Sequence, residues 1–195
     1  MKHSAVKSKK RPTAAPRPAS PTKRAKRRAT KSKPAGAGPL SRREIVLLRE
    51  SFARIEPQAG IAAMIFYRNL FTLDPALRPL FHTTIELQGR KLMDSLAYTV
   101  ATLEEPEKLV PALEAMGRRH VTYGTKNEHY ATVVQAMLQT LDDCLEQSFT
   151  PAVKAAWVKA LGFVSATMQQ GAHDVQVLLD EQQARVAPGK CPFGH

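Results

Sequence analysis

Cysteines and long apolar runs are both scarce in this sequence. Two cysteines among 195 residues are too few for a disulfide framework, so a reducing cytoplasm is the expected compartment. No apolar run approaches the roughly 18–20 residues that a membrane-spanning helix needs. The basic N-terminus is not followed by the apolar stretch of a secretory signal. We therefore expect a cytoplasmic protein rather than a secreted or membrane-spanning one.

Acidic residues are absent from residues 1–40, which hold 13 of the 29 Lys and Arg residues. The rest of the chain therefore carries 16 basic residues against all 17 acidic ones, so a basic tail precedes a nearly neutral body. The tail has too few apolar residues to offset the entropy of ordering, and we predict that it is disordered. The sequence thus divides into a tail (1–40), a folded domain (41–183) and a flexible, inert C-terminal tail (184–195).

The charge of residues 1–40 indicates a polyanionic partner. Thirteen cations on a flexible chain would bind nucleic acid without sequence preference, and they would also be attracted to anionic membranes. The tail lacks aromatic residues, so stacking on bases is not expected. A purely solubilising extension remains the alternative.

Strand-like alternation and internal repeats are also missing, whereas helical spacing of apolar residues recurs throughout the body. The pattern predicts an all-α domain of about seven helices, including a short one that ends near Phe81 and a long last one that continues past Gly171. Three helix starts carry a capping box or a capping residue followed by proline. These are Ser41 with Glu44, Asp74 with Pro75, and Thr150 with Pro151.

His120 is the candidate residue with the clearest chemistry. It lies on the apolar face of a predicted helix that ends just before Gly124, and Gln88 lies in the preceding amphipathic segment. Tyr67 and Phe81 lie further upstream. A single histidine at a helix end is usually structural. Together, however, these residues suggest a flat iron cofactor between two helices, with a ligand on one side and hydrogen-bonding groups on the other.

These motifs, in this order, resemble globins, most closely single-domain bacterial globins, the globin part of flavohaemoglobins and neuroglobin-like proteins. The resemblance covers roughly Ile45–Gln170 and implies a globin fold, a three-over-three sandwich of helices, that binds haem b through its iron. Five segments carry it: Phe66–Phe71, Asp74–Phe81, Gln88–Met93, Gly117–Gly124, and Phe149–Pro151 followed by Trp157 and Gly162.

The resemblance also implies roles for individual residues. His120 would be the proximal ligand of the iron, and Tyr67 and Gln88 the distal polar pair. Lys91 would pair with a haem propionate, although a solvated lysine is an equally good interpretation. No catalytic residue is assigned. The other positions implied to contact haem are Phe81, Leu92, Met116, Tyr130 and Val133.

Two departures from flavohaemoglobins bear on the expected function. The sequence contains no flavin- or NAD-binding domain, and Ala172 stands where those enzymes have a glutamate coupled to the proximal histidine. We therefore expect reversible binding of O₂, NO or CO at an iron held by one neutral imidazole. The alternatives are an NO dioxygenase that depends on a separate reductase, and a gas or redox sensor that binds nucleic acid or membrane through residues 1–40. A homodimer is a further hypothesis.

Overall fold

The computed structural model describes residues 39–186, with side chains to residue 182. The predicted tails lie almost entirely outside the described residues. The described part consists of six α-helices and three 3₁₀ helices, without strands, and none of its helices is long and apolar enough to cross a membrane. The elements are α1 (Arg42–Ile55), η1 (Glu56–Gln58), α2 (Ala59–Leu73), η2 (Pro75–Leu80), α3 (Ile85–Ala101), α4 (Pro106–Thr122), α5 (Asn127–Leu145), η3 (Glu146–Ser148) and α6 (Pro151–Val186).

Helix starts follow the sequence signals closely. The Ser41 hydroxyl accepts from the Glu44 N–H at 3.3 Å, and the Glu44 carboxylate accepts from the Ser41 N–H at 2.6 Å. The Asp74 carboxylate caps Ala76 at 3.0 Å. The short helix after Asp74 is a 3₁₀ helix rather than an α-helix. Pro79 inside the segment accounts for this, because it lacks the N–H that an α-helix would use at that position.

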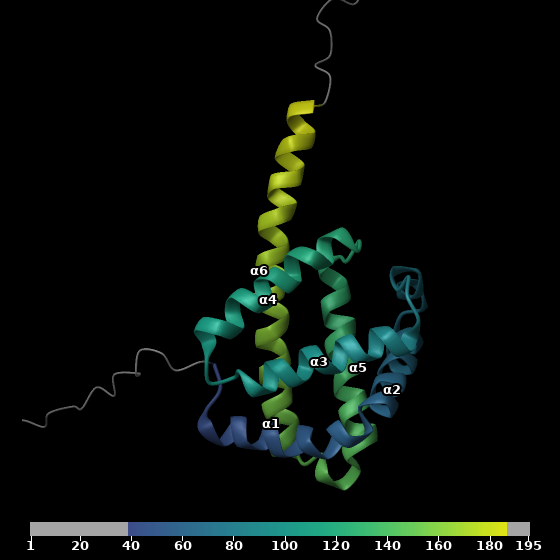
Figure 1. Cartoon of the computed structure of the whole chain (residues 1–195), viewed down its shortest axis with the longest axis vertical. Helices are drawn as coiled ribbons and strands as arrows, with labels where there is room; N and C mark the ends of the chain where they lie inside the picture. Colours follow the sequence, from purple (N-terminus) through teal and green to yellow (C-terminus); the bar gives the residue numbers. More distant parts are fainter. Residues whose placement is uncertain (1–38, 187–195) are drawn as a thin grey trace, which may run out of the picture. The chain divides into compact units, whose positions relative to one another are not determined.

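The six α-helices form two crossed layers. In Figure 1, α1, α3 and α4 cross over α2, α5 and α6, and helix pairs α1–α6, α4–α6 and α2–α3 make contact between the layers. The predicted three-over-three sandwich is therefore confirmed. Its most extensive helix contact joins α4 to α6.

A buried polar contact holds α1 against α6. The Trp157 indole, only 1% exposed, donates its N–H to the Ser51 hydroxyl at 2.9 Å. Ser51 in turn donates to the Leu47 carbonyl at 2.7 Å, so neither buried group lacks a partner. Leu40, the last residue assigned to the tail, is 8% exposed and packs in the same core.

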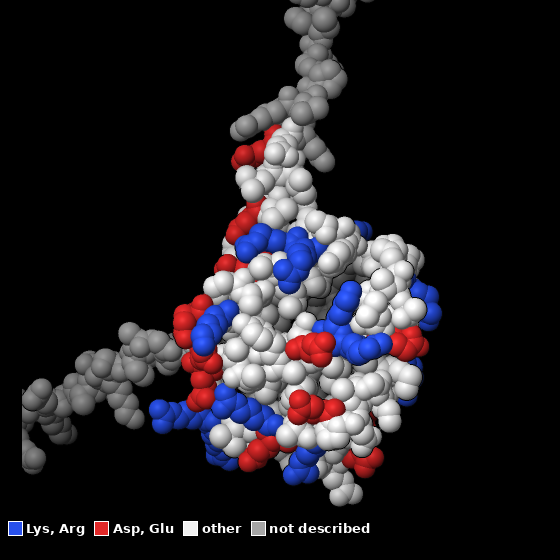
Figure 2. All heavy atoms as spheres, viewed as in Figure 1, with Lys and Arg blue, Asp and Glu red and all other residues white. Residues whose placement is uncertain are grey.

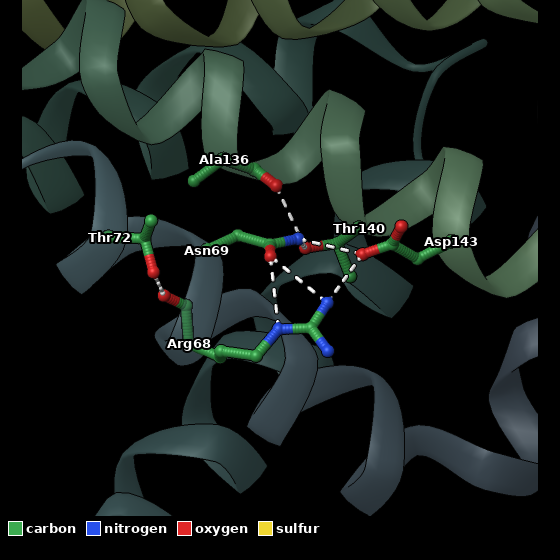
Figure 3. A network of polar contacts seen from close by, with 6 residues as sticks. All are labelled: Arg68, Asn69, Thr72, Ala136, Thr140 and Asp143. Atoms are coloured by element: carbon green, nitrogen blue, oxygen red, sulfur yellow. Dashed lines mark hydrogen bonds and ion pairs between the residues drawn. The ribbon is translucent and has the colours of Figure 1, made fainter.

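A second polar network joins α2 to α5 (Figure 3). The buried Asn69 amide donates to the Thr140 hydroxyl at 3.3 Å and to the Asp143 carboxylate at 3.1 Å. Arg68 reaches the same carboxylate at 2.7 Å and donates to the side-chain oxygen Oδ1 of Asn69. Because each polar group of the Asn69 side chain has a partner, this amide is buried without the penalty of an unpaired one.

The last helix continues well past the layered body, as expected from the sequence. Figure 1 shows the end of α6 projecting beyond the other helices, and α6 ends at Val186 rather than at 183. On this projecting part Leu178 is 60% exposed, and Val177 and Leu179 are each 40% exposed.

The capping box makes stability depend on pH. Its hydrogen bonds to Ser41, with help from Lys159, lower the pKa of Glu44 from 4.5 to about 2. A carboxylate with a lowered folded-state pKa contributes stability above its unfolded pKa and loses it as the pH falls through the folded value. We expect Glu44→Gln to reduce the loss of unfolding free energy between pH 4.5 and about 2. Urea unfolding across this interval measures it, with Glu50→Gln on the exposed face of α1 as control. Equal pH dependence in wild type and Glu44→Gln would contradict this assignment.

Candidate functional site

His120 lies in the last turn of α4 with one ring nitrogen engaged. Its Nδ1 is 2.8 Å from the Met116 carbonyl oxygen. A carbonyl only accepts, so Nδ1 carries the proton and Nε2 keeps its lone pair. Burial, with a smaller contribution from Arg119, lowers the pKa of His120 below its ordinary value of 6.5. The imidazole is therefore neutral at pH 7, and its Nε2 makes no hydrogen bond within the described residues.

Three aromatic rings form one wall near the α2–η2 junction. The Tyr67 and Phe81 ring centroids lie 5.3 Å apart, edge to face, and Phe71 lies 5.5 Å from Phe81. Tyr67 is 5% exposed, and burial raises its pKa to about 12. Its hydroxyl therefore stays protonated at neutral pH, and it makes no hydrogen bond within residues 39–186.

Gln88 lies in the first turn of α3, which packs closely on α2. Thr84 caps this helix by accepting from the Leu87 N–H at 3.4 Å. A methyl group added to the neighbouring Gly89 would lie 2.8 Å from the Ala63 side chain on α2. Because Ala63 lies one helical turn before Tyr67, this close contact brings the helix that carries Gln88 next to the helix that carries Tyr67.

The molecular surface is hollowed between α3 and α4. Figure 2 shows this hollow, with basic side chains on both sides of it. Arg90 and Lys91 on α3 and Arg118 and Arg119 on α4 are all exposed. Among the described residues none of these four cations forms an ion pair, whereas Arg49, Arg68 and Lys159 do.

The structure places the remaining predicted residues at different depths. Leu92 and Met116 are half-buried against the core, whereas Lys91 is exposed and Val133 is 37% exposed. Tyr130 is 7% exposed, and its hydroxyl is the one buried side-chain polar atom of the described part that has no hydrogen-bond partner.

Two features of the site were not predicted from the sequence. Phe71 joins the aromatic wall, and its spacing of four residues from Tyr67 on the same helix is a signal that predicts this neighbourhood. The second feature is an apolar cavity beside Leu92. No local sequence pattern indicates this cavity, because its walls come from four helices. It is lined by Ile55, Ala62, Phe66, Leu92, Met93, Leu96, Met137, Thr140 and Leu141.

These observations fit haem better than a bare metal ion. No three His, Cys, Asp or Glu side chains of the described part gather as a metal-binding group. The site instead offers one neutral imidazole whose Nε2 is free within residues 39–186, aromatic rings, and cations without an ion pair in that part of the chain. The Tyr130 hydroxyl, whose ring centroid lies 6.5 Å from that of His120, adds a donor that no described residue satisfies.

Comparison with known proteins agrees with this assignment. The family model described as Globin matches residues 65–168. The chain is 25% identical over 158 residues to a flavohemoprotein of Vibrio cholerae serotype O1, covering 80% of this chain but only 38% of that protein. It is 27% identical over 146 residues to neuroglobin of Dissostichus mawsoni, covering 68% of this chain and 92% of that protein.

A solved structure supports the same fold. It is described as a hexacoordinated heme protein from an anhydrobiotic tardigrade, and it matches with a TM-score of 0.64 at 17% identity, over 69% of this chain and 96% of that one. The helix sandwich and its hollow thus define a haem protein of the globin fold. The chain belongs to the globin family, and haem is its cofactor.

The unpaired hydroxyl of Tyr130 yields a prediction for the haem-free protein. A buried hydroxyl without a partner carries a desolvation penalty of roughly 1–3 kcal/mol, so Tyr130→Phe should raise the free energy of unfolding by about 1 kcal/mol. Urea unfolding measures this change, and Tyr98→Phe is the control because Tyr98 is 46% exposed. A loss of stability in Tyr130→Phe alone would mean that the hydroxyl has a partner.

Proposed function

We propose that this globin reversibly binds a diatomic gas, O₂ with NO and CO as further ligands, at a haem iron held by His120. The observation that carries this proposal is the state of the imidazole. Its Nδ1 donates to the Met116 carbonyl at 2.8 Å, which leaves Nε2 deprotonated and without a partner among the described residues. Such a ring, fixed in tautomer and orientation by its second nitrogen, has the form in which histidine binds metals.

The partner of Nδ1 also favours binding over catalysis. When bound, haem supplies an iron with an open coordination position for a gas. The group that His120 bonds is a neutral carbonyl rather than a carboxylate, so the ring gains little additional negative charge. Ala172, at the position where the resemblance implies a glutamate, is 8% exposed and offers no side-chain acceptor. Both observations support a gas carrier or sensor over an enzyme.

Tyr67 and Gln88 are proposed to hydrogen-bond the gas on the opposite side of the pocket from His120. The Tyr67 hydroxyl remains a donor at neutral pH because burial raises its pKa to about 12. Gln88, partly exposed in the first turn of α3, adds an amide donor that solvent can reach. In an apolar surrounding a hydrogen bond is stronger than it is in water, so Tyr67 should contribute more to retention of the gas.

The remaining residues are proposed to hold the cofactor. Phe81 packs on the macrocycle, and Leu92, Met116 and Val133 form apolar walls. Tyr130 offers its unpaired hydroxyl. Lys91 is proposed to pair with a propionate, a role supported by its exposure and by the lack of any ion pair to it within the described residues.

Substitution of His120 tests the proposal directly. We expect His120→Ala to weaken haem binding by more than the 10- to 100-fold that loss of an outer-shell partner typically causes. The ferric, ferrous and CO spectra should change with it. His173→Ala, at an exposed histidine of α6, is the matched control. If haem binding and the spectra of His120→Ala match those of the control, another residue holds the iron.

Substitution of Tyr67 tests the distal side. Loss of one hydrogen bond worth about 0.5–1.5 kcal/mol should make O₂ dissociate from Tyr67→Phe roughly two- to tenfold faster. Stopped-flow displacement of O₂ by CO measures this rate. Tyr98→Phe should keep the wild-type rate, since Tyr98 lies on the exposed face of α3. An unchanged rate in Tyr67→Phe would remove this tyrosine from the gas site.

Similarity to the Vibrio cholerae flavohemoprotein favours one alternative activity, NO dioxygenation. In that reaction NO, O₂ and one electron give nitrate, so an external reductase must supply an electron for every turnover. The chain spans 38% of the length of that relative, and a reductase partner is thus a proposal only. Repeated nitrate formation with a supplied reductase distinguishes this enzyme from a carrier, which returns the gas unchanged.

Two further proposals rest on composition. Residues 1–40, with 13 cations and no acidic residue, are proposed to bind nucleic acid or anionic membrane non-specifically. A cytoplasmic location is proposed because the two cysteines of the sequence are too few for a disulfide framework.

A further inference from the structure

The contact between α4 and α6 depends on two glycines. A methyl group added to Gly117 would overlap the Met168 carbonyl oxygen and lie 2.7 Å from its carbonyl carbon. A methyl group added to Gly171 would overlap the Glu114 carbonyl oxygen and lie 2.7 Å from the Glu114 carbonyl carbon and Cα. In both cases the neighbour is backbone, which cannot swing aside as a side chain can.

The two contacts are reciprocal. Gly117 meets Met168, and Gly171 meets Glu114, so each glycine faces the residue three positions before the other glycine. The two helices therefore touch backbone to backbone over one turn. Each glycine destabilises its helix by about 1 kcal/mol relative to alanine. Both glycines are buried, and the close packing of the two helices offsets this loss of helix stability.

This contact adjoins the proposed iron ligand. Gly117 follows Met116, whose carbonyl orients the His120 ring at 2.8 Å. The carbonyl, the glycine and the histidine lie within five consecutive residues of one regular helix. Any shift of α4 away from α6 would therefore move the imidazole and its hydrogen-bond partner together, without breaking the bond between them.

We propose that Gly117 and Gly171 are positioning residues for His120. Their missing side chains let α4 lie directly on the α6 backbone. The resulting separation between the two helices sets how far the imidazole reaches into the pocket. The inference rests on the proposed role of His120. With alanine at either position, the added Cβ would overlap a carbonyl oxygen of the other helix and lie 2.7 Å from its carbonyl carbon, closer than the 3.4 Å of an ordinary contact. The two helices must therefore move apart, and α4 moves toward the hollow.

The test compares Gly117→Ala and Gly171→Ala with Gly162→Ala. Gly162 also lies on α6, but a methyl group there meets nothing within 4 Å, so this variant controls for the change in helix propensity. We expect both test variants to shift the iron–histidine vibration in resonance Raman spectra of the ferrous protein. We also expect about tenfold faster haem transfer to an acceptor protein. Gly162→Ala should match wild type in both measurements.

A second background separates positioning from general destabilisation. In His120→Gly with free imidazole as ligand, the iron ligand is no longer attached to α4. Adding Gly117→Ala in this background should leave the iron–imidazole vibration unchanged, whereas in the wild-type background it shifts the band. Circular dichroism of the haem-free variants, read at the same time, confirms that each one is folded.

The outcomes separate the two proposals. Spectra and haem transfer in Gly117→Ala and Gly171→Ala that equal those of Gly162→Ala would overturn the positioning role and leave His120 as ligand. A shift of the vibration by Gly117→Ala that persists with free imidazole would also overturn the positioning role. Failure of both glycine variants to fold would overturn it as well, because the contact would then serve folding alone. An unchanged iron–histidine band in His120→Gly without imidazole would instead overturn the proposed function.

Discussion

The hydrogen bond from His120 to the Met116 carbonyl is the constraint on which the proposed site depends. It places the proton on Nδ1, leaves Nε2 free and fixes the plane of the ring, all through one contact of 2.8 Å. Burial acts in the same direction, because it lowers the pKa of the imidazole and keeps the ring neutral. Since the acceptor belongs to the same helix turn, the arrangement moves with α4 as a unit and needs no partner from elsewhere in the fold.

The two sides of the hollow are built on the same packing device. On one side Gly89 brings α3 close to Ala63 of α2, and on the other Gly117 brings α4 onto α6. In each case the residue proposed to act at the site, Gln88 or His120, lies within three positions of the glycine. The opening between α3 and α4 is thus bounded by two helices that are each held back against the second layer. Larger residues in place of Gly89 and Gly117 would narrow the opening between α3 and α4.

Much of this architecture could be predicted from local sequence. The capping signals at Ser41 and Asp74 act between residues two or three positions apart, so a linear pattern contains all of the information. The continuation of α6 past Gly171 followed from its periodicity in the same way. For the site residues, the order of the motifs and their resemblance to globins added what periodicity lacks, because an apolar stripe alone does not distinguish a ligand from a core histidine.

Contacts between distant segments could not be predicted in this way. The close contact of Gly117 with Met168 joins residues 51 positions apart in the sequence. The hydrogen bond from Asn69 to Asp143 joins residues 74 positions apart. Both depend on how helices cross. The residue identities are visible in the sequence, but their partners follow only from the packing of the two layers.

The length of α6 gives one helix two different environments. Its first half contributes Trp157 and Met168 to the core, whereas Val177, Leu178 and Leu179 lie in the exposed half. Backbone amides of the buried half open to solvent only with the whole domain, while amides of the projecting half open by local fraying. We therefore expect the free energy of amide opening to fall along this single helix, from the global free energy of unfolding in its buried part to nearly zero at its projecting end.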